Sequence, residues 1–192
     1  MVSHLEGMVG KIALLRELDA VGEMERRWDE WEDGNEEYGE FSADGPLSLD
    51  DCVEPDGEWA GGLGDFWRLT NGATFGSLWI HRQGQIRPTS VVDSLGEPID
   101  DRNWLSIGSV DEQALVMDAD SGTVMIYWYL YFKHRWDSGV VFECADIPEL
   151  IDTVALGPKY PLTFGPPERQ KSPWWERDSW YLYLCEIGLI HR

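Results

Sequence analysis

Acidic side chains interleaved with aromatic rings are the residues of this chain best suited to specific chemistry with a partner. Carboxylates attract a basic molecule over a distance and speed its association. Large rings supply much of the binding energy at protein interfaces. The simpler interpretation of such a run is a solvated helix face. The residues that we predict to contact a partner are Trp28, Asp29, Glu30, Trp31, Glu36, Glu37 and Tyr38.

Metal and nucleophile chemistry is poorly supported by the spacing of the other reactive residues. No histidine has a cysteine or a second histidine at ligand spacing, and the cysteines form no close pair. We therefore predict no catalytic residue, no metal and no cofactor, and we interpret Cys144 and Cys185 as core thiols. The residues concerned are His4, His81, His134 and His191, with Cys52, Cys144 and Cys185.

Paired carboxylates are too frequent to single out an acid–base pair. Asp118 and Asp120 resemble the start of a calcium loop, but the later ligands are missing, so residues 118–122 are interpreted as a hairpin turn. The glycines at Gly61 and Gly62 lack the Lys and Ser/Thr of a phosphate loop. We interpret them as a flexible approach to a helix.

The overall charge limits the classes of partner. The 192 residues include 36 acidic and 15 basic side chains, a net charge of −21. Nucleic acids and anionic membranes are bound through Lys and Arg, so direct binding to either is disfavoured. Such a charge most commonly keeps a cytosolic protein soluble; the other interpretation is a basic partner protein, which the clustering of the acidic residues favours. The unpaired cysteines and the absence of a signal-peptide pattern at the start predict a cytoplasmic protein.

Helical spacing and turn residues predict helices at both ends of the chain. A helix is expected over residues 8–31, weakened at Gly22, followed by an acidic connection over 32–58 that is long enough to be flexible and has one helical turn near residues 47–53. Trp59, Phe66 and Trp67 mark a helix that ends at Asn71-Gly72. Further helices are expected from Asp146 to Gly157-Pro158, with an N-cap and early Pro148, and over residues 173–187 after an irregular, proline-rich segment.

The middle of the chain has the alternation and turn residues of strands. Strands are predicted over residues 78–80, 86–92, 104–110, 113–117 and 123–129, with an edge strand over 140–144. Helices separated from a block of strands indicate an α+β fold with an antiparallel sheet of five to six strands. We expect one domain over residues 1–192, with a C-terminal helical extension over 172–190.

Four landmarks in residues 59–156 occur in the order seen in a known family. They are Leu69-Thr70-Asn71-Gly72, the strand containing Trp104, Ile107 and Gly108, the hairpin at 118–122 and the helix from Asp146. In this order they resemble the SUKH superfamily. The resemblance implies a non-enzymatic immunity protein that binds and neutralises a cognate toxin, for which a nuclease with a basic face is one candidate. An intracellular scaffold or regulatory member of the superfamily is the alternative, and a hydrolase using acidic residues is the least favoured hypothesis.

Overall fold

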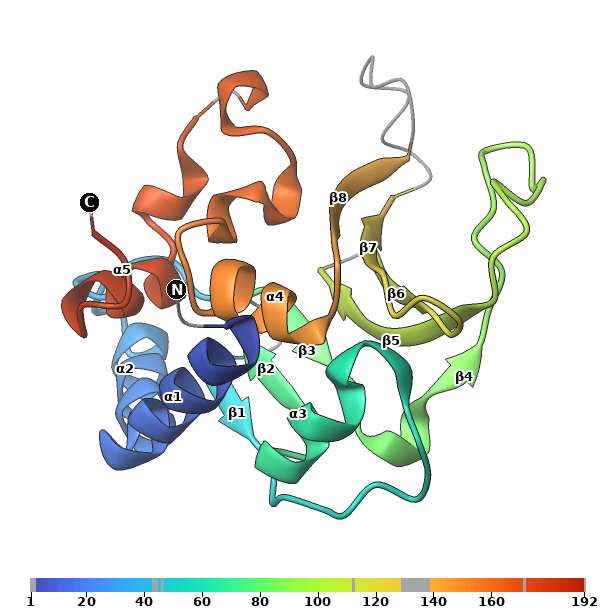
Figure 1. The fold of residues 1–192 in the computed structure, drawn as a ribbon. Coiled ribbons are helices and arrows are strands. Elements are labelled where there is room, and N and C mark those ends of the chain that lie inside the picture. Colours follow the sequence, from blue (N-terminus) through green and yellow to red (C-terminus); the bar gives the residue numbers. More distant parts are fainter. Residues whose placement is uncertain are drawn as a thin grey trace.

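The chain folds as helices packed on an open antiparallel sheet (Figure 1). The computed structural model describes residues 3–42, 45, 47–111, 113–128, 139–170 and 172–191. The α+β prediction is confirmed, but within these residues the sheet has eight strands rather than five or six. Tyr129, the last residue of the strand predicted over 123–129, lies outside the described residues. The same is true of His134, one of the histidines considered as metal ligands.

The N-terminal helical segment is two helices. Helix α1, His4–Glu17, begins at a capping box in which Ser3 and Glu6 satisfy each other's backbone N–H groups. Helix α2, Ala20–Glu32, follows after Asp19, which has a left-handed φ of 50°. The break therefore falls at Asp19 and not at Gly22, because aspartate tolerates the left-handed region when the chain must turn.

The acidic connection contributes a strand where a helical turn was predicted. Strand β1, Leu47–Leu49, pairs with β2, Ala73–Phe75, which pairs with β3, Leu78–Ile80. The predicted turn over residues 47–53 is wrong because Leu47 is buried opposite Phe75, a partner 28 positions later that no local pattern indicates.

Helix α3, Leu63–Leu69, ends two residues before the predicted Asn71-Gly72 stop. Thr70 is extended, and its hydroxyl donates to the carbonyl of Gly72 at 2.7 Å. The short 3-10 turn η1, Ala60–Gly62, precedes α3, so Trp59 lies outside the helix. Gly61, with φ 58°, lies so close to the 118–122 hairpin that a Cβ would stand 2.5 Å from the oxygen of Gly122. Close approach, and not flexibility, is what requires glycine there.

The second half of the sheet is a meander. Strands β5, β6, β7 and β8 pair in sequence order, and β8 forms the edge. The predicted hairpin and edge strand are confirmed. The predicted strand over 86–92 shrinks to the two residues of β4, because Pro88 cannot donate to a ladder. The bounds are β4 Arg87–Pro88, β5 Trp104–Val110, β6 Gln113–Asp118, β7 Val124–Tyr127 and β8 Val140–Cys144, with a 3-10 turn η2 at Gln83–Gln85.

A series of short helical turns follows β8 and leads to α5. The predicted helix over 173–187 begins only at Ser179, because Asp178 caps it by accepting the N–H of Tyr181. The helix after Asp146 is confirmed, although its second part is a π-helix. The bounds are α4 Ile147–Glu149, π-helix η4 Leu150–Ala155, 3-10 turns η5 Tyr160–Phe164, η6 Pro167–Arg169 and η7 Trp174–Glu176, and α5 Ser179–Glu186.

One hydrophobic cluster joins both ends of the chain to the sheet. Met8 of α1, Phe66 of α3, Ile126 of β7, Leu150 of η4 and Trp180 of α5 all belong to it and are fully buried. The C-terminal segment therefore completes the core instead of extending from it. None of the helices in the described ranges combines the length and the apolar composition needed to cross a bilayer.

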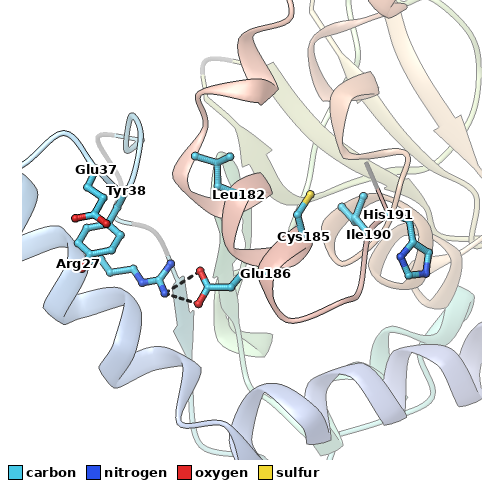
Figure 2. Close-up of a pocket in the computed structure, with 8 residues that line it drawn as sticks. All are labelled: Arg27, Glu37, Tyr38, Leu182, Cys185, Glu186, Ile190 and His191. Carbon is cyan, nitrogen blue, oxygen red and sulfur yellow. Dashed lines mark hydrogen bonds and ion pairs between the residues drawn. The ribbon is translucent and has the colours of Figure 1, made fainter.

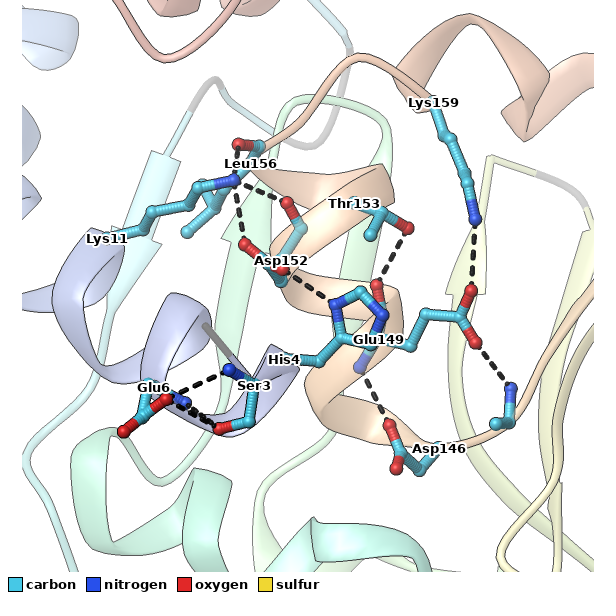
Figure 3. Close-up of polar contacts among 11 residues, drawn as sticks. Ser3, His4, Glu6, Lys11, Asp146, Glu149, Asp152, Thr153, Leu156 and Lys159 are labelled. Carbon is cyan, nitrogen blue, oxygen red and sulfur yellow. Dashed lines mark hydrogen bonds and ion pairs between the residues drawn. The ribbon is translucent and has the colours of Figure 1, made fainter. Parts of the chain in front are cut away.

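A network of ion pairs and hydrogen bonds holds α1 against η4 (Figure 3). Asp152 of η4 contacts His4 Nδ1 at 2.8 Å and Lys11 Nζ at 2.9 Å. Lys11 also donates to the carbonyl of Leu156 at 3.0 Å, which satisfies an orphan acceptor at the helix end. The network accounts for these charges structurally, so we assign it no binding role.

Candidate partner-binding surface

The two predicted tryptophans form a compact cluster of rings with a third residue. Trp28 and Trp31 lie on the last turns of α2, with ring centroids 5.5 Å apart. Phe41, from the acidic connection, packs on both, at 5.4 Å from Trp28 and 5.5 Å from Trp31. All three side chains are half-buried. We call Trp28, Trp31 and Phe41 the ring cluster; its rings are held in place and still reach solvent.

The predicted acidic residues divide into two groups. Asp29, Glu36 and Glu37 are exposed, and within the described residues their carboxylates make no ion pair. Glu30 is instead paired with Arg26 of the same helix. Asp29, Glu36 and Glu37 are therefore the carboxylates that remain available to a partner.

Tyr38 contacts two arginines of α2 and is not a free anchor. Its ring lies under the guanidinium groups of Arg26 and Arg27, at 5.7 and 4.9 Å from the ring centroid. A cation above an aromatic face is attracted by the ring quadrupole. Tyr38 thus helps to fix the chain after α2 in position.

Arg27 links α2 to α5 through hydrogen bonds to Glu186 (Figure 2). Its side chain is 9% exposed and donates to Glu23 at 2.6 Å and to Glu186 of α5 at 2.9 and 3.0 Å. Its guanidinium also lies 5.1 Å from the ring centroid of Tyr183. Burial lowers the pKa of Arg27, but the hydrogen bonds to Glu186 and Glu23 outweigh it and raise the pKa above its usual value. The charge is therefore retained.

Two neighbouring pockets form a groove between the chain after α2 and helix α5. Figure 2 shows the first, of about 630 Å³, and the second measures about 570 Å³. Both are lined by Glu37 and Leu182, so they adjoin each other, and we call the two together the acidic groove. The other lining residues are Arg27, Tyr38, Cys185, Glu186, Ile190 and His191 in the first pocket, and Trp31, Glu36, Gly39, Glu40, Glu176 and Arg177 in the second.

The sequence analysis did not predict that α5 and the segment just before it line this groove. Glu40 and Asp178 are joined by a parallel backbone bridge, in which Ser179 donates its N–H to the carbonyl of Glu40 at 2.9 Å. This bridge places the 172–190 segment beside the acidic connection, more than 130 positions away in sequence. Local patterns predicted a helix over residues 173–187, but they do not report a contact between segments so far apart in the sequence.

A third pocket, of about 340 Å³, shares the lining residue Glu40 with the acidic groove. We call it the aromatic pocket. Asp178 is the most deeply buried carboxyl in it, at 8% exposure. Burial raises the pKa of Asp178 to about 7, against the opposing hydrogen bond from the Tyr181 N–H. Its lining residues are Glu40, Phe41, Ser42, Ser77, Asp111, Phe164, Trp174 and Asp178.

The cysteines and the turn aspartate considered in the sequence analysis contribute to packing and to a turn. Burial raises the pKa of the Cys144 thiol to about 12, so it is an inert core residue as predicted, whereas Cys185 is half-buried. The hydroxyl of Ser121 donates to Asp118 at 2.6 Å, which lowers the pKa of Asp118 and confirms a turn at 118–122. Among the described residues, no three His, Cys, Asp or Glu side chains gather in a metal-binding arrangement.

Comparison of the chain with protein-family models, with curated proteins and with solved structures found no match.

Proposed function

We propose that this protein acts by binding a basic protein, and that it is an immunity protein that neutralises a cognate toxin without chemistry of its own. The observation that carries the proposal is the surface around the end of α2. There the exposed carboxylates of Glu36 and Glu37 line the acidic groove beside Trp31 of the ring cluster, and the exposed Asp29 lies on the same end of α2. Charge and apolar anchors at one place are what a tight, fast-binding interface needs.

Each part of this surface has a separate physical task. The exposed carboxylates raise the association rate by attracting the partner before contact, an effect that salt weakens. The rings of Trp28 and Trp31 are held by Phe41, so little side-chain entropy is lost when they are covered. The groove then accepts protruding side chains of the partner. A toxin nuclease is the partner class proposed, because its nucleic-acid face is basic.

The family assignment remains part of the proposal and rests on the ordered landmarks of residues 59–156. The structure has the expected helix before β2 and the hairpin at 118–122 in that order, which is compatible with a SUKH-like domain. We place its action in the cytoplasm, because its three cysteines are all free. A scaffold or regulatory protein would use the same surface on a different partner.

One observation bears on the alternative of a hydrolase. Asp178 has the raised pKa of a general acid and shares its pocket with Asp111. However, Oδ1 of Asp178 accepts the N–H of Tyr181 at 2.8 Å, and Oδ2 accepts the hydroxyl of Tyr160 at 3.5 Å. Capping of α5 accounts for this position, so the binding function is the better supported.

Rescue of cells tests the function directly. The protein should protect cells that express the toxin encoded beside its gene, and the purified pair should associate in a salt-sensitive manner. Failure of the wild-type protein both to protect cells and to bind any product of a neighbouring gene would refute the immunity function.

A charge variant tests the surface. The triple variant Asp29→Asn, Glu36→Gln, Glu37→Gln should slow association about tenfold at low salt, with a smaller change in dissociation. A control with the same change in net charge replaces Glu54, Glu97 and Asp101, which are exposed acids outside the groove. Equal association rates for the two triple variants would exclude the end of α2 from the interface.

A further inference from the structure

We propose that the aromatic pocket holds an arginine side chain of the partner protein. The inference deepens the proposed function, since it takes the bound cation to belong to the basic partner, and it names the chemistry that the pocket recognises. The pocket lies next to the acidic groove and shares Glu40 with it, so a partner lying over the groove also lies beside this pocket.

The walls of the pocket present aromatic faces and edges that are fixed by their neighbours. Trp174 packs edge-on to Phe164 with centroids 4.8 Å apart, and it also contacts Tyr160 at 5.5 Å. Phe41 also lines the pocket, and its ring is held by Trp28 and Trp31. Aromatic walls attract a cation most strongly where water is partly excluded.

One residue of the pocket lining, Asp178, is a buried carboxyl with no cation among the described residues. Asp178 makes no ion pair within the described part of the chain, although it is 8% exposed. Glu40 is paired with Arg177 at the surface. Asp111, exposed and with φ 51°, is held at the rim by its N–H, which donates to the carbonyl of Ser77 at 3.1 Å. A buried carboxyl is costly unless it is paired, so a cation that enters gains more here than at an exposed acid.

Arginine fits this combination better than lysine. Its planar guanidinium stacks on aromatic rings, bonds carboxylates through two N–H groups and is less strongly hydrated than an ammonium. The volume of about 340 Å³ admits one such side chain with its stem. Lysine and a neutral ligand of the same shape are the alternatives that the experiment separates.

Small arginine derivatives test the pocket in the absence of any partner. The full-length, ¹⁵N-labelled protein is titrated with N-acetyl-arginine amide, N-acetyl-lysine amide and N-acetyl-citrulline amide, the last being a neutral isostere. The indole N–H signal of Trp174 is identified by its loss in Trp174→Phe. We expect saturable shifts with the arginine derivative at a dissociation constant of about 1 mM, weaker binding of lysine and no saturation with citrulline.

A conservative variant assigns the binding to the carboxyl. Asp178→Asn keeps the N-cap, because asparagine caps helices as well as aspartate, and should weaken arginine binding about tenfold or more. Glu97→Gln, an exposed acid outside the pocket, should bind like the wild type.

Three outcomes overturn the inference: citrulline binds as well as arginine, lysine binds as well as or better than arginine, or Asp178→Asn leaves the affinity unchanged. None of them affects the association-rate test of the proposed function, which uses the toxin and other residues. Conversely, loss of the immunity function leaves the free-ligand titration interpretable.

Discussion

Replacement of Asp178 by asparagine should stabilise the protein at neutral pH. The substitution keeps the size of the side chain and the oxygen that accepts the Tyr181 N–H at 2.8 Å, so helix α5 remains capped. It removes a carboxyl whose ionised form is disfavoured in the folded protein. The reason is that Asp178 is only 8% exposed and makes no ion pair within the described residues. Burial is the main cause of its raised pKa, and Glu40 adds to it; the N–H groups of Tyr181 and Trp180 and the Tyr160 hydroxyl act against it by donating to the carboxylate.

The magnitude follows from the difference in proton binding between folded and unfolded chains. The folded pKa of Asp178 is about 7 and its ordinary value is 3.8. Between these values the folded protein holds a proton that the unfolded chain has lost, so the free energy of unfolding falls as the pH rises. A difference of about three pH units corresponds to about 4 kcal/mol once the pH exceeds 7. Asp178→Asn does not carry this penalty.

Urea unfolding of both proteins at a series of pH values measures the effect. The free energy of unfolding of Asp178→Asn minus that of the wild type should be near zero at pH 4 and should rise to about 2–4 kcal/mol at pH 8. Taking the difference cancels the other carboxylates, which titrate in both proteins. A difference that does not change with pH, or a variant less stable than the wild type at pH 8, would refute the claim that burial disfavours the ionised carboxyl.

Three further substitutions test the contacts that hold the surface in place, each measured by the same unfolding assay. Arg27→Lys should lose about 2 kcal/mol, because lysine cannot replace the two-armed contact between α2 and α5, whereas the exposed Arg26→Lys should change little. Gly61→Ala should lose about 3 kcal/mol or more through a Cβ 2.5 Å from facing backbone, while Gly96→Ala, also at positive φ but in open space, should lose about 1 kcal/mol; similar losses would contradict the close approach. Asp152→Asn should lose about 1–2 kcal/mol at pH 7. Hydrogen bonds from His4 and Lys11 outweigh burial and lower the pKa of Asp152, so this stabilisation is present above pH 3.8 and disappears as the pH falls through the lowered value.

The elements with strong local signals were predictable from the sequence. The hairpin at 118–122 follows from a turn cluster between two apolar runs, and the helix after Asp146 follows from a cap residue and an early proline. The α+β class and the acidic, ring-bearing stretch around Trp28 and Trp31 also follow from spacing and composition. These features depend on residues within about ten positions of one another, which is the range over which periodicity and turn chemistry act.

The elements that depend on distant partners were not predictable in this way. Strand β1 exists because Leu47 pairs opposite Phe75, and α5 reaches α2 because Glu186 meets Arg27. The amino-acid sequence by itself determined the charge, the rings and the local elements. Tertiary packing decided that Arg27 pairs with Glu186 and that, in the described part of the chain, Asp178 is buried without an ion pair. The physical reason is that burial and ion pairing are set by neighbours in space, and these neighbours come from opposite ends of the chain.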